Sequence, residues 1–321
     1  MTTIYLHIGQ EKTGTTSIQQ FLVSNRKFLF DTYGILYPYN KKISTDNKSF
    51  FNHAKFTGSF LDYKERSFVK MERLLTVKDS IEELKLVIKK KKPKAIIISS
   101  EHLSSRLNGE HIKELAKQLD SYDVKIICYV RRQDDYQISR FSESLKSGAK
   151  KWLKLKANFS KNKRLNYLDN LSPWLDWFGR ESIILCPFDK KRFVNESLYD
   201  DFLSKLGVSE FSKFIVPDSS NISVSKEEAD VLLALNKVLL TWADVNNDVT
   251  LAKFRRSQEI RKEVLTIMQT NRDIKVHTAL KDSFSKKDKE HFMSHFIDSN
   301  RKLSELYYNR KELFPLQKKE S

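Results

Sequence analysis

The segment Gly9–Thr16, which reads Gly-Gln-Glu-Lys-Thr-Gly-Thr-Thr, constrains the fold more than any other part of the chain. It follows the apolar run Thr3–Ile8 and precedes Thr15–Phe28, in which apolar residues recur at helical spacing. A strand, a loop and a helix in this order direct backbone N–H groups and the positive end of the helix dipole at one point. The segment therefore predicts an anion site within an α/β fold.

The loop is close to a Walker A phosphate loop but differs at the residue that would clamp a γ-phosphate. Walker A is G-x-x-x-x-G-K-[ST], and its Lys reaches the β- and γ-phosphates. Gly9 and Gly14 keep the glycine spacing, but Thr15 stands in place of the Lys and the cation has moved to Lys12. This difference favours a nucleotide with a short phosphate chain over ATP hydrolysis.

A second candidate phosphate contact follows the apolar run Val124–Val130. Arg131 directly follows this run, and Ser139 lies eight positions later in a helical pattern. A guanidinium offers a fork of donors to phosphate oxygens, and a hydroxyl adds a neutral donor. The adjacent Arg132 leaves open which arginine binds. A strand-end arginine paired with an aspartate, and a helical serine facing solvent, are the alternatives.

Read together, the two motifs resemble the 5′- and 3′-phosphate motifs of sulfotransferases that use 3′-phosphoadenosine 5′-phosphosulfate (PAPS). A looser similarity to bacterial carbohydrate sulfotransferases extends through Phe141–Gly148 and into segments 221–225 and 298–304. The resemblance implies PAPS as donor, 3′-phosphoadenosine 5′-phosphate (PAP) as product, and no required metal. It implies that the cofactor-binding residues are Lys12, Thr13, Gly14, Thr15, Thr16, Arg131 and Ser139. Lys12 would also act in catalysis, by neutralising the bridging oxygen of the leaving phosphate.

Transfer of a sulfuryl group to a hydroxyl also needs a group that accepts the hydroxyl proton near Lys12. Glu101 is the first candidate, because it follows the apolar run Ala95–Ser99 at the expected carboxyl end of a parallel strand, where open α/β sheets place ligands. His53 is the second, because a neutral imidazole can accept a proton near pH 7. The alternatives are a carboxylate at a helix N-terminus and a structural histidine. His102 is a candidate for orienting Glu101.

Strand-like and helical patterns alternate through the first two thirds of the chain. The expected strands are Thr3–Ile8, Gly34–Tyr37, Ala95–Ser99, Val124–Val130 and Ser182–Cys186. The expected helices are Thr15–Phe28, Lys78–Lys91, Gly109–Leu119, Asp134–Lys146 and Asn166–Phe178. This alternation predicts a three-layer αβα fold with a mostly parallel central sheet.

After Pro217 the patterns are helical. Ser225 with Glu228 three residues later predicts a capping box, and further helices are expected at Leu251–Gln269 and Lys287–Tyr308. We therefore expect a PAPS-binding α/β core over residues 1–217 and a helical extension packed on it over residues 218–321. The region from about residue 40 to 72 is assigned no role.

The net charge of +17 indicates anionic partners. It is concentrated in the segment Lys146–Arg164, which holds eight basic and no acidic residues with aromatic residues between them. We interpret this basic segment either as a solvated loop or as a rim or lid for an anionic carbohydrate acceptor. The family resemblance, and not the charge, implies the expected function: sulfuryl transfer from PAPS to a carbohydrate hydroxyl, in a bacterial surface glycan or glycolipid precursor. The alternatives are a P-loop nucleotide kinase and a non-enzymatic binder of nucleic acid or acidic membranes, although no known nucleic-acid module is present.

Cysteine usage and hydropathy indicate the compartment. Cys128 and Cys186 both lie in strand-like runs, which favours buried free thiols in a reducing environment. No secretory signal precedes the first strand, and no run approaches the roughly 20 apolar residues of a membrane span. We therefore expect a soluble cytoplasmic protein, with peripheral association with an acidic membrane surface as an option.

Overall fold

The computed structural model describes residues 1–39, 44–47, 50–66, 75–155, 159, 162, 164–217, 224–245, 251–270, 278–309 and 312–314. The chain divides into two compact units. The first comprises Met1–Arg132, Asn162–Ser219 and Asp298–Ser321, and the second Gln133–Lys161 and Ser220–Ile297. Both units are discontinuous in sequence, whereas the predicted boundary at residue 217 is a single cut. The predicted division into an α/β core and a packed helical extension stays a prediction.

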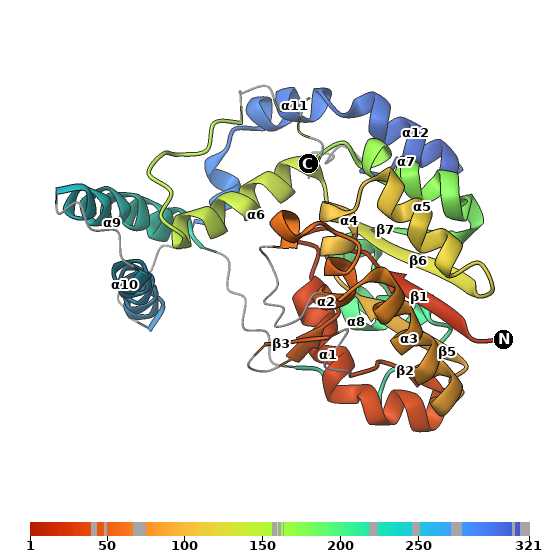
Figure 1. Cartoon of the computed structure of the whole chain (residues 1–321). Helices are drawn as coiled ribbons and strands as arrows, with labels where there is room; N and C mark the ends of the chain where they lie inside the picture. Colours follow the sequence, from red (N-terminus) through yellow and green to blue (C-terminus); the bar gives the residue numbers. More distant parts are fainter. Residues whose placement is uncertain are drawn as a thin grey trace. The chain divides into compact units, whose positions relative to one another are not determined.

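A five-stranded sheet with the order β2-β5-β1-β6-β7 forms the centre of the first unit (Figure 1). Every pair of neighbouring strands is parallel. The strands are β1 (Thr3–His7), β2 (Ile35–Leu36), β5 (Ala95–Ser99), β6 (Asp123–Val130) and β7 (Ile183–Pro187). Each lies within about two residues of a strand that the sequence predicts, because long apolar runs mark buried parallel strands.

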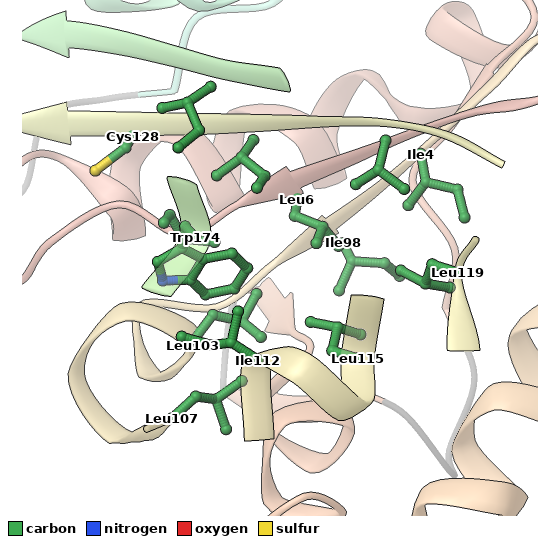
Figure 2. Close-up of a cluster of buried hydrophobic side chains, with 14 of the residues drawn as sticks. Ile4, Leu6, Ile98, Leu103, Leu107, Ile112, Leu115, Leu119, Cys128 and Trp174 are labelled. Atoms are coloured by element: carbon green, nitrogen blue, oxygen red, sulfur yellow. The ribbon is translucent and has the colours of Figure 1, made fainter. Parts of the chain in front are cut away.

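One face of the sheet packs against helices of the first unit. Figure 2 shows Leu6 and Ile98 from the sheet with Ile112, Leu115 and Trp174 from the helices, in one hydrophobic cluster. The helices that supply this layer are α3 (Val77–Lys91), α5 (Gly109–Gln118), α7 (Tyr167–Phe178) and α12 (Ile297–Tyr307). The short helix α4 (His102–Arg106) adds Leu103 to the same cluster.

The opposite face packs against α1 (Thr15–Phe28) and α8 (Leu198–Lys205). Alternate strand residues face it, among them Ile97, Tyr129 and Cys186. The sheet is therefore covered on both sides, which confirms the predicted αβα class. The two cysteines are free and buried, as predicted, and they belong to clusters on opposite faces although β6 and β7 are neighbours.

The structure also contains shorter elements, some of them between residues 40 and 72, the region for which the sequence predicts no role. A hairpin of β3 (Thr45–Asn47) and β4 (Phe50–Asn52) precedes α2 (Ala54–Gly58). Single-turn elements are η1 (Leu29–Tyr33), η2 (Tyr63–Arg66), η3 (Arg180–Ser182), η4 (Lys190–Arg192), η5 (Val194–Glu196) and η6 (Leu280–Ser283).

The second unit contains α6 (Gln133–Lys146), α9 (Lys226–Val245), α10 (Leu251–Thr270) and α11 (Lys286–Ser294). The predicted capping box is confirmed at the start of α9: the Ser225 N–H donates to Glu228 at 2.7 Å, and the Glu228 N–H donates to the Ser225 hydroxyl at 3.1 Å. A buried clamp joins three helices. Asn236 donates to the carbonyls of Leu145 and Ala149 and accepts from Arg261.

The predicted helix Lys287–Tyr308 is wrong as a single element, because α11 ends at Ser294 and α12 begins at Ile297. Phe292 and Phe296 are buried on the second-unit side of the break, whereas Leu303 belongs to a core cluster of the first unit. Two shorter helices, each with its own buried residues, therefore replace the single predicted one.

Candidate phosphate site

Three predicted site residues follow neighbouring strands of the sheet at the same edge. Lys12 follows β1, Glu101 follows β5, and Arg131 follows β6. In the strand order, the connection from β1 runs to β2 at one edge of the sheet, whereas the connection from its neighbour β6 runs to β7 at the other edge, so the two leave in opposite directions. In open parallel sheets, ligands bind at the carboxyl ends of the strands at such a switch point. The topology therefore brings Lys12, Glu101 and Arg131 to the same edge of the sheet.

The loop between β1 and α1 has a strained backbone. Lys12 has φ 67° and Gly14 has φ 76°, both in the left-handed region. This region costs an L-residue such as Lys12 about 1–2 kcal/mol, and strain of this kind collects at ligand sites. A Cβ on Gly14 would lie 2.4 Å from Leu198 Cδ2 and 3.1 Å from Phe188 Cε2. Glycine is thus required at this position by conformation and by space.

The N-terminus of α1 carries no side-chain cap. Its N-cap is Gly14, and its first turn contains no acidic residue. By contrast, Thr76, Asn108 and Ser197 accept backbone N–H groups at the starts of α3, α5 and α8. The first N–H groups of α1 therefore keep their capacity to bind an anion, and the positive end of its dipole is not neutralised by a carboxylate in that turn.

Two buried polar atoms lie at this loop with no hydrogen-bond partner in the described part of the chain. They are His7 Nε2 and Gln10 Oε1. His7 has no exposed surface, and Gln10 is 6% exposed. Thr13 and Thr15 turn their hydroxyls to the Gln10 carbonyl, at 2.6 and 3.4 Å. Unsatisfied buried polar atoms are rare in native proteins, and they are expected where a ligand completes a site.

Arg131 connects the second motif to the first. Its Nη1 donates to the Lys12 carbonyl at 3.2 Å, across 119 residues of sequence. Its guanidinium lies 5.6 Å from the centre of the Phe188 ring, and its own carbonyl accepts a hydrogen bond from the Tyr167 hydroxyl. The side chain is thereby held beside the phosphate loop.

Glu101 lies within electrostatic reach of Lys12. Burial raises the pKa of Glu101, the charge of Glu11 raises it further, and the charge of Lys12 opposes both. Glu11 itself forms a 2.8 Å ion pair with Arg164. A carboxyl with a raised pKa beside a cation is a suitable proton acceptor. The neighbouring His102 has its pKa lowered to about 4, mainly by burial and then by Arg106.

His53, the second candidate base, is fully buried and has both ring nitrogens hydrogen-bonded to backbone. Its Nδ1 accepts from the Ser99 N–H at 3.1 Å, and its Nε2 lies 3.0 Å from the Pro38 carbonyl, to which it donates. Burial lowers the pKa of His53 to about 4. These bonds tie the segment before α2 to the end of β5, so His53 would have to break one of them to accept a proton.

Ser139 lies on α6, in the second unit, and its pairing with Arg131 stays a prediction. The basic segment falls partly outside the described residues, at 156–158, 160, 161 and 163. Of its aromatic residues, Trp152 packs against Phe141 and Phe159 packs against Phe292, all within the second unit. The role of this segment as a rim or lid also stays a prediction.

Sequence reasoning missed two features of the site. Phe188 follows β7 directly and contacts both motifs through Gly14 and Arg131. Its position directly after a predicted strand could have indicated it, because the carboxyl ends of parallel strands lie at the same edge of a sheet. The Glu11–Arg164 ion pair has no local signal, since its partners are 153 residues apart.

Two general features concern metals and membranes. Within the described residues, no group of three or more His, Cys, Asp or Glu side chains is placed to hold a metal ion. No described helix is both long enough and apolar enough to cross a membrane.

Comparison with known proteins gives few matches. No family model matches the chain. A protein of Archaeoglobus fulgidus, described only as uncharacterized, is 28% identical over 225 residues; the match covers 70% of this chain and 57% of that protein. The chain thus spans little more than half the length of this relative. Among solved structures, a sulfotransferase from Alicyclobacillus acidocaldarius matches 78% of this chain and 98% of its own, with 18% identity and a TM-score of 0.40.

Proposed function

We propose that the chain is a PAPS-dependent sulfotransferase that transfers the sulfuryl group to a carbohydrate hydroxyl. The observation that carries the proposal is the meeting of the two motifs: Arg131 donates to the backbone of Lys12, beside an uncapped helix N-terminus. A phosphate at that helix end would lie near the Lys12 side chain and the Thr15 and Thr16 hydroxyls. The choice of PAPS and of a carbohydrate acceptor rests on the resemblance of the motifs.

In the proposed reaction, Glu101 removes the proton from the acceptor hydroxyl as that oxygen attacks sulfur. The new bond joins the acceptor oxygen to sulfur, and the bond between sulfur and the bridging oxygen of the phosphosulfate breaks. The electron pair of the broken bond stays on that oxygen, which becomes part of the 5′-phosphate of PAP. Lys12 and the first N–H groups of α1 stabilise the charge that develops there.

Arg131 binds the 3′-phosphate in this proposal. A guanidinium can donate two parallel hydrogen bonds to phosphate oxygens, which would distinguish PAPS from adenylates without a 3′-phosphate. One donor of Arg131 is occupied by the Lys12 carbonyl. The same contact would make the position of the loop depend on that of the 3′-phosphate group.

The proposal is tested by thermal shift and calorimetry with PAP, PAPS and ATP-Mg. We expect PAP to stabilise the protein without a metal, by about 2.7 kcal/mol at a hundredfold excess over Kd. Lys12→Ala and Arg131→Ala should each weaken PAP binding about 10- to 100-fold, since each removes a charged hydrogen-bonding group. Lys27→Ala is the matched control, because Lys27 lies at the far end of α1 with its side chain 90% exposed.

Two outcomes contradict the proposal. One is stabilisation by ATP-Mg with none by PAP, which is the kinase outcome. The other is normal PAP binding by both variants. The acceptor is then sought with ³⁵S-labelled PAPS and a panel of neutral and acidic oligosaccharides, where Glu101→Gln should bind PAP normally but transfer sulfate 10²–10⁴-fold more slowly.

A further inference from the structure

His7 is the one buried titratable residue at the phosphate loop to which the proposed reaction gives no role. Its ring is fully buried and lies against Tyr129 and Phe202, at centroid distances of 6.3 and 5.2 Å. This apolar surrounding lowers the pKa of His7 to about 3, so the ring is neutral. A neutral imidazole has one N–H donor and one acceptor nitrogen, and their assignment decides what the ring can do.

The neighbours of His7 identify which nitrogen carries the proton. Ser99 Oγ lies 2.9 Å from His7 Nδ1 and accepts a hydrogen bond from Gln19 Nε2 at 3.1 Å. Ser99 is fully buried, and His7 Nδ1 is the one acceptor for its hydroxyl proton among the described residues. A buried hydroxyl normally donates its proton, so Nδ1 is the acceptor and Nε2 carries the ring N–H.

This N–H points to the phosphate loop. A Cβ added to Gly9 would lie 2.7 Å from His7 Nε2, 3.0 Å from Thr15 Oγ1 and 3.4 Å from Thr13 Oγ1. These three polar atoms therefore surround one point beneath the loop, in the space that the absence of a side chain on Gly9 leaves open. His7 Nε2 has no partner there, and the Thr15 hydroxyl makes only a long contact of 3.4 Å to the Gln10 carbonyl.

We propose that His7 is a positioning residue for the phosphate loop, the central member of a hydrogen-bond relay from Gln19 through Ser99 and His7 to Thr15. When an anion binds at the N-terminus of α1, the Thr15 hydroxyl turns away from the Gln10 carbonyl and donates its hydrogen bond to the anion. The oxygen of Thr15 then accepts the N–H of His7. Every member of the relay donates once to the next, and such chains strengthen each bond by polarisation.

The relay is built on rigid elements. Thr15 and Gln19 are four residues apart on α1 and therefore face the same side, and each is 3% exposed. His7 and Ser99 are paired in the register of β1 and β5. The ring thus connects the first turn of the helix to two central strands. Burial lowers the pKa of His7 to about 3, so the ring is neutral near pH 7.

The first test is the tautomer of His7 in the free protein, measured by long-range ¹H–¹⁵N NMR. We expect the Nε2–H form, and a downfield shift of the Nε2 proton when PAP or inorganic pyrophosphate is added. An Nδ1–H tautomer, or an Nε2 proton that does not respond to either anion, would overturn the relay. This measurement uses the wild-type protein and does not depend on whether a variant folds.

The second test compares two substitutions. His7→Phe keeps the ring shape but removes the donor, and it should weaken PAP binding about three- to tenfold. His7→Gln retains an N–H group at the reach of Nε2 and an oxygen that can accept from Ser99, so it should restore most of that loss. Equal affinities for His7→Phe and wild type, or no rescue by glutamine, contradict the relay.

The inference rests on the proposed function only for the identity of the anion. If the protein binds pyrophosphate but not PAP, the proposed function fails, and the response of the His7 ring to pyrophosphate still decides the relay. If the protein binds neither anion, both proposals are overturned.

Discussion

At the scale of single residues, Gly14 illustrates how the site depends on conformation. It has φ 76°, and a Cβ there would lie 2.4 Å from Leu198. The sequence motif predicts a glycine in a phosphate loop at this position. It does not predict the contacts with Leu198 and Phe188, which come from segments more than 170 residues away.

We therefore expect Gly14→Ala to destabilise the protein more than a glycine substitution at a position with positive φ but no close neighbours. The matched control is Gly207→Ala, at φ 77° with no atom within 4 Å of the added Cβ. The control should cost about 1–2 kcal/mol in the free energy of unfolding. Gly14→Ala should cost more and should also abolish PAP binding. Urea unfolding measures the change in the free energy of unfolding, and calorimetry measures PAP binding. Equal destabilisation by the two substitutions would contradict a cost from the close packing at Gly14.

Glu101 has a pH signature of its own. Because the pKa of Glu101 in the folded protein is raised above its ordinary value, the unfolded chain ionises Glu101 at lower pH than the folded one. The stability that this difference confers exists below the unfolded pKa and is lost as pH rises through the folded one. Glu101→Gln should thus raise the melting temperature at pH 7–8 and leave it unchanged near pH 4. A lowered melting temperature at pH 8 would contradict this expectation.

At the scale of elements, the second unit depends on a few buried polar contacts. Asn236 donates to two carbonyls at the end of α6 and accepts from Arg261 of α10 at 2.6 Å. Arg261 is 4% exposed and also donates to Ser257 at 3.0 Å. This clamp holds α6, α9 and α10 together by satisfying groups that would otherwise be buried without partners.

Asn236→Leu should therefore destabilise the second unit selectively. The substitution removes one hydrogen-bond partner from each of two carbonyls and from a buried guanidinium, at a cost of about 1–3 kcal/mol. Amide hydrogen exchange should accelerate in α6, α9 and α10 and remain slow in β1 and β5. Lys262→Ala, at an exposed neighbour of Arg261, is the control and should leave exchange unchanged. Uniform acceleration through the sheet would contradict a local role.

At the scale of the whole molecule, buried histidines determine how the protein responds to acid. Burial lowers the pKa of His7 to about 3 and that of His53 to about 4. Both pKa values in the folded protein lie below the ordinary histidine pKa of about 6.5, so below that pH the unfolded chain binds more protons than the folded one. The stability conferred by the neutral rings is complete above about pH 6.5 and is lost as the pH falls toward the folded values.

Unfolding free energies measured in urea between pH 7 and pH 5 test this expectation. Well below the unfolded pKa, each ring should contribute a loss of about 1.4 kcal/mol per pH unit. His53→Gln should remove the His53 contribution and reduce the slope accordingly, while those of His7 and of His102, whose pKa is also lowered to about 4, remain. A slope that is unchanged in this variant would show that His53 is already protonated in the folded protein.

The secondary-structure elements and the fold class could be predicted from the sequence, because each depends on local pattern. Apolar runs indicate the five parallel strands, helical spacing predicts α1 at Thr15–Phe28, and Ser225 with Glu228 indicates the start of α9. The break between α11 and α12 is not predicted, because the helical spacing of apolar residues continues across it. The glycine spacing around Lys12 also identified the phosphate loop, since its backbone geometry is encoded locally.

The contacts around the phosphate loop depend on the tertiary structure and could not be predicted from local pattern. The bond from Arg131 to the Lys12 carbonyl, the Phe188 ring against Gly14, and the partners of His7 join segments that are distant in sequence. A histidine in a strand reads as a core residue, and its sequence context does not reveal an N–H directed at a phosphate loop. Hydrogen bonds and burial depend on which side chains the fold brings together, and that is fixed by the order and register of the strands.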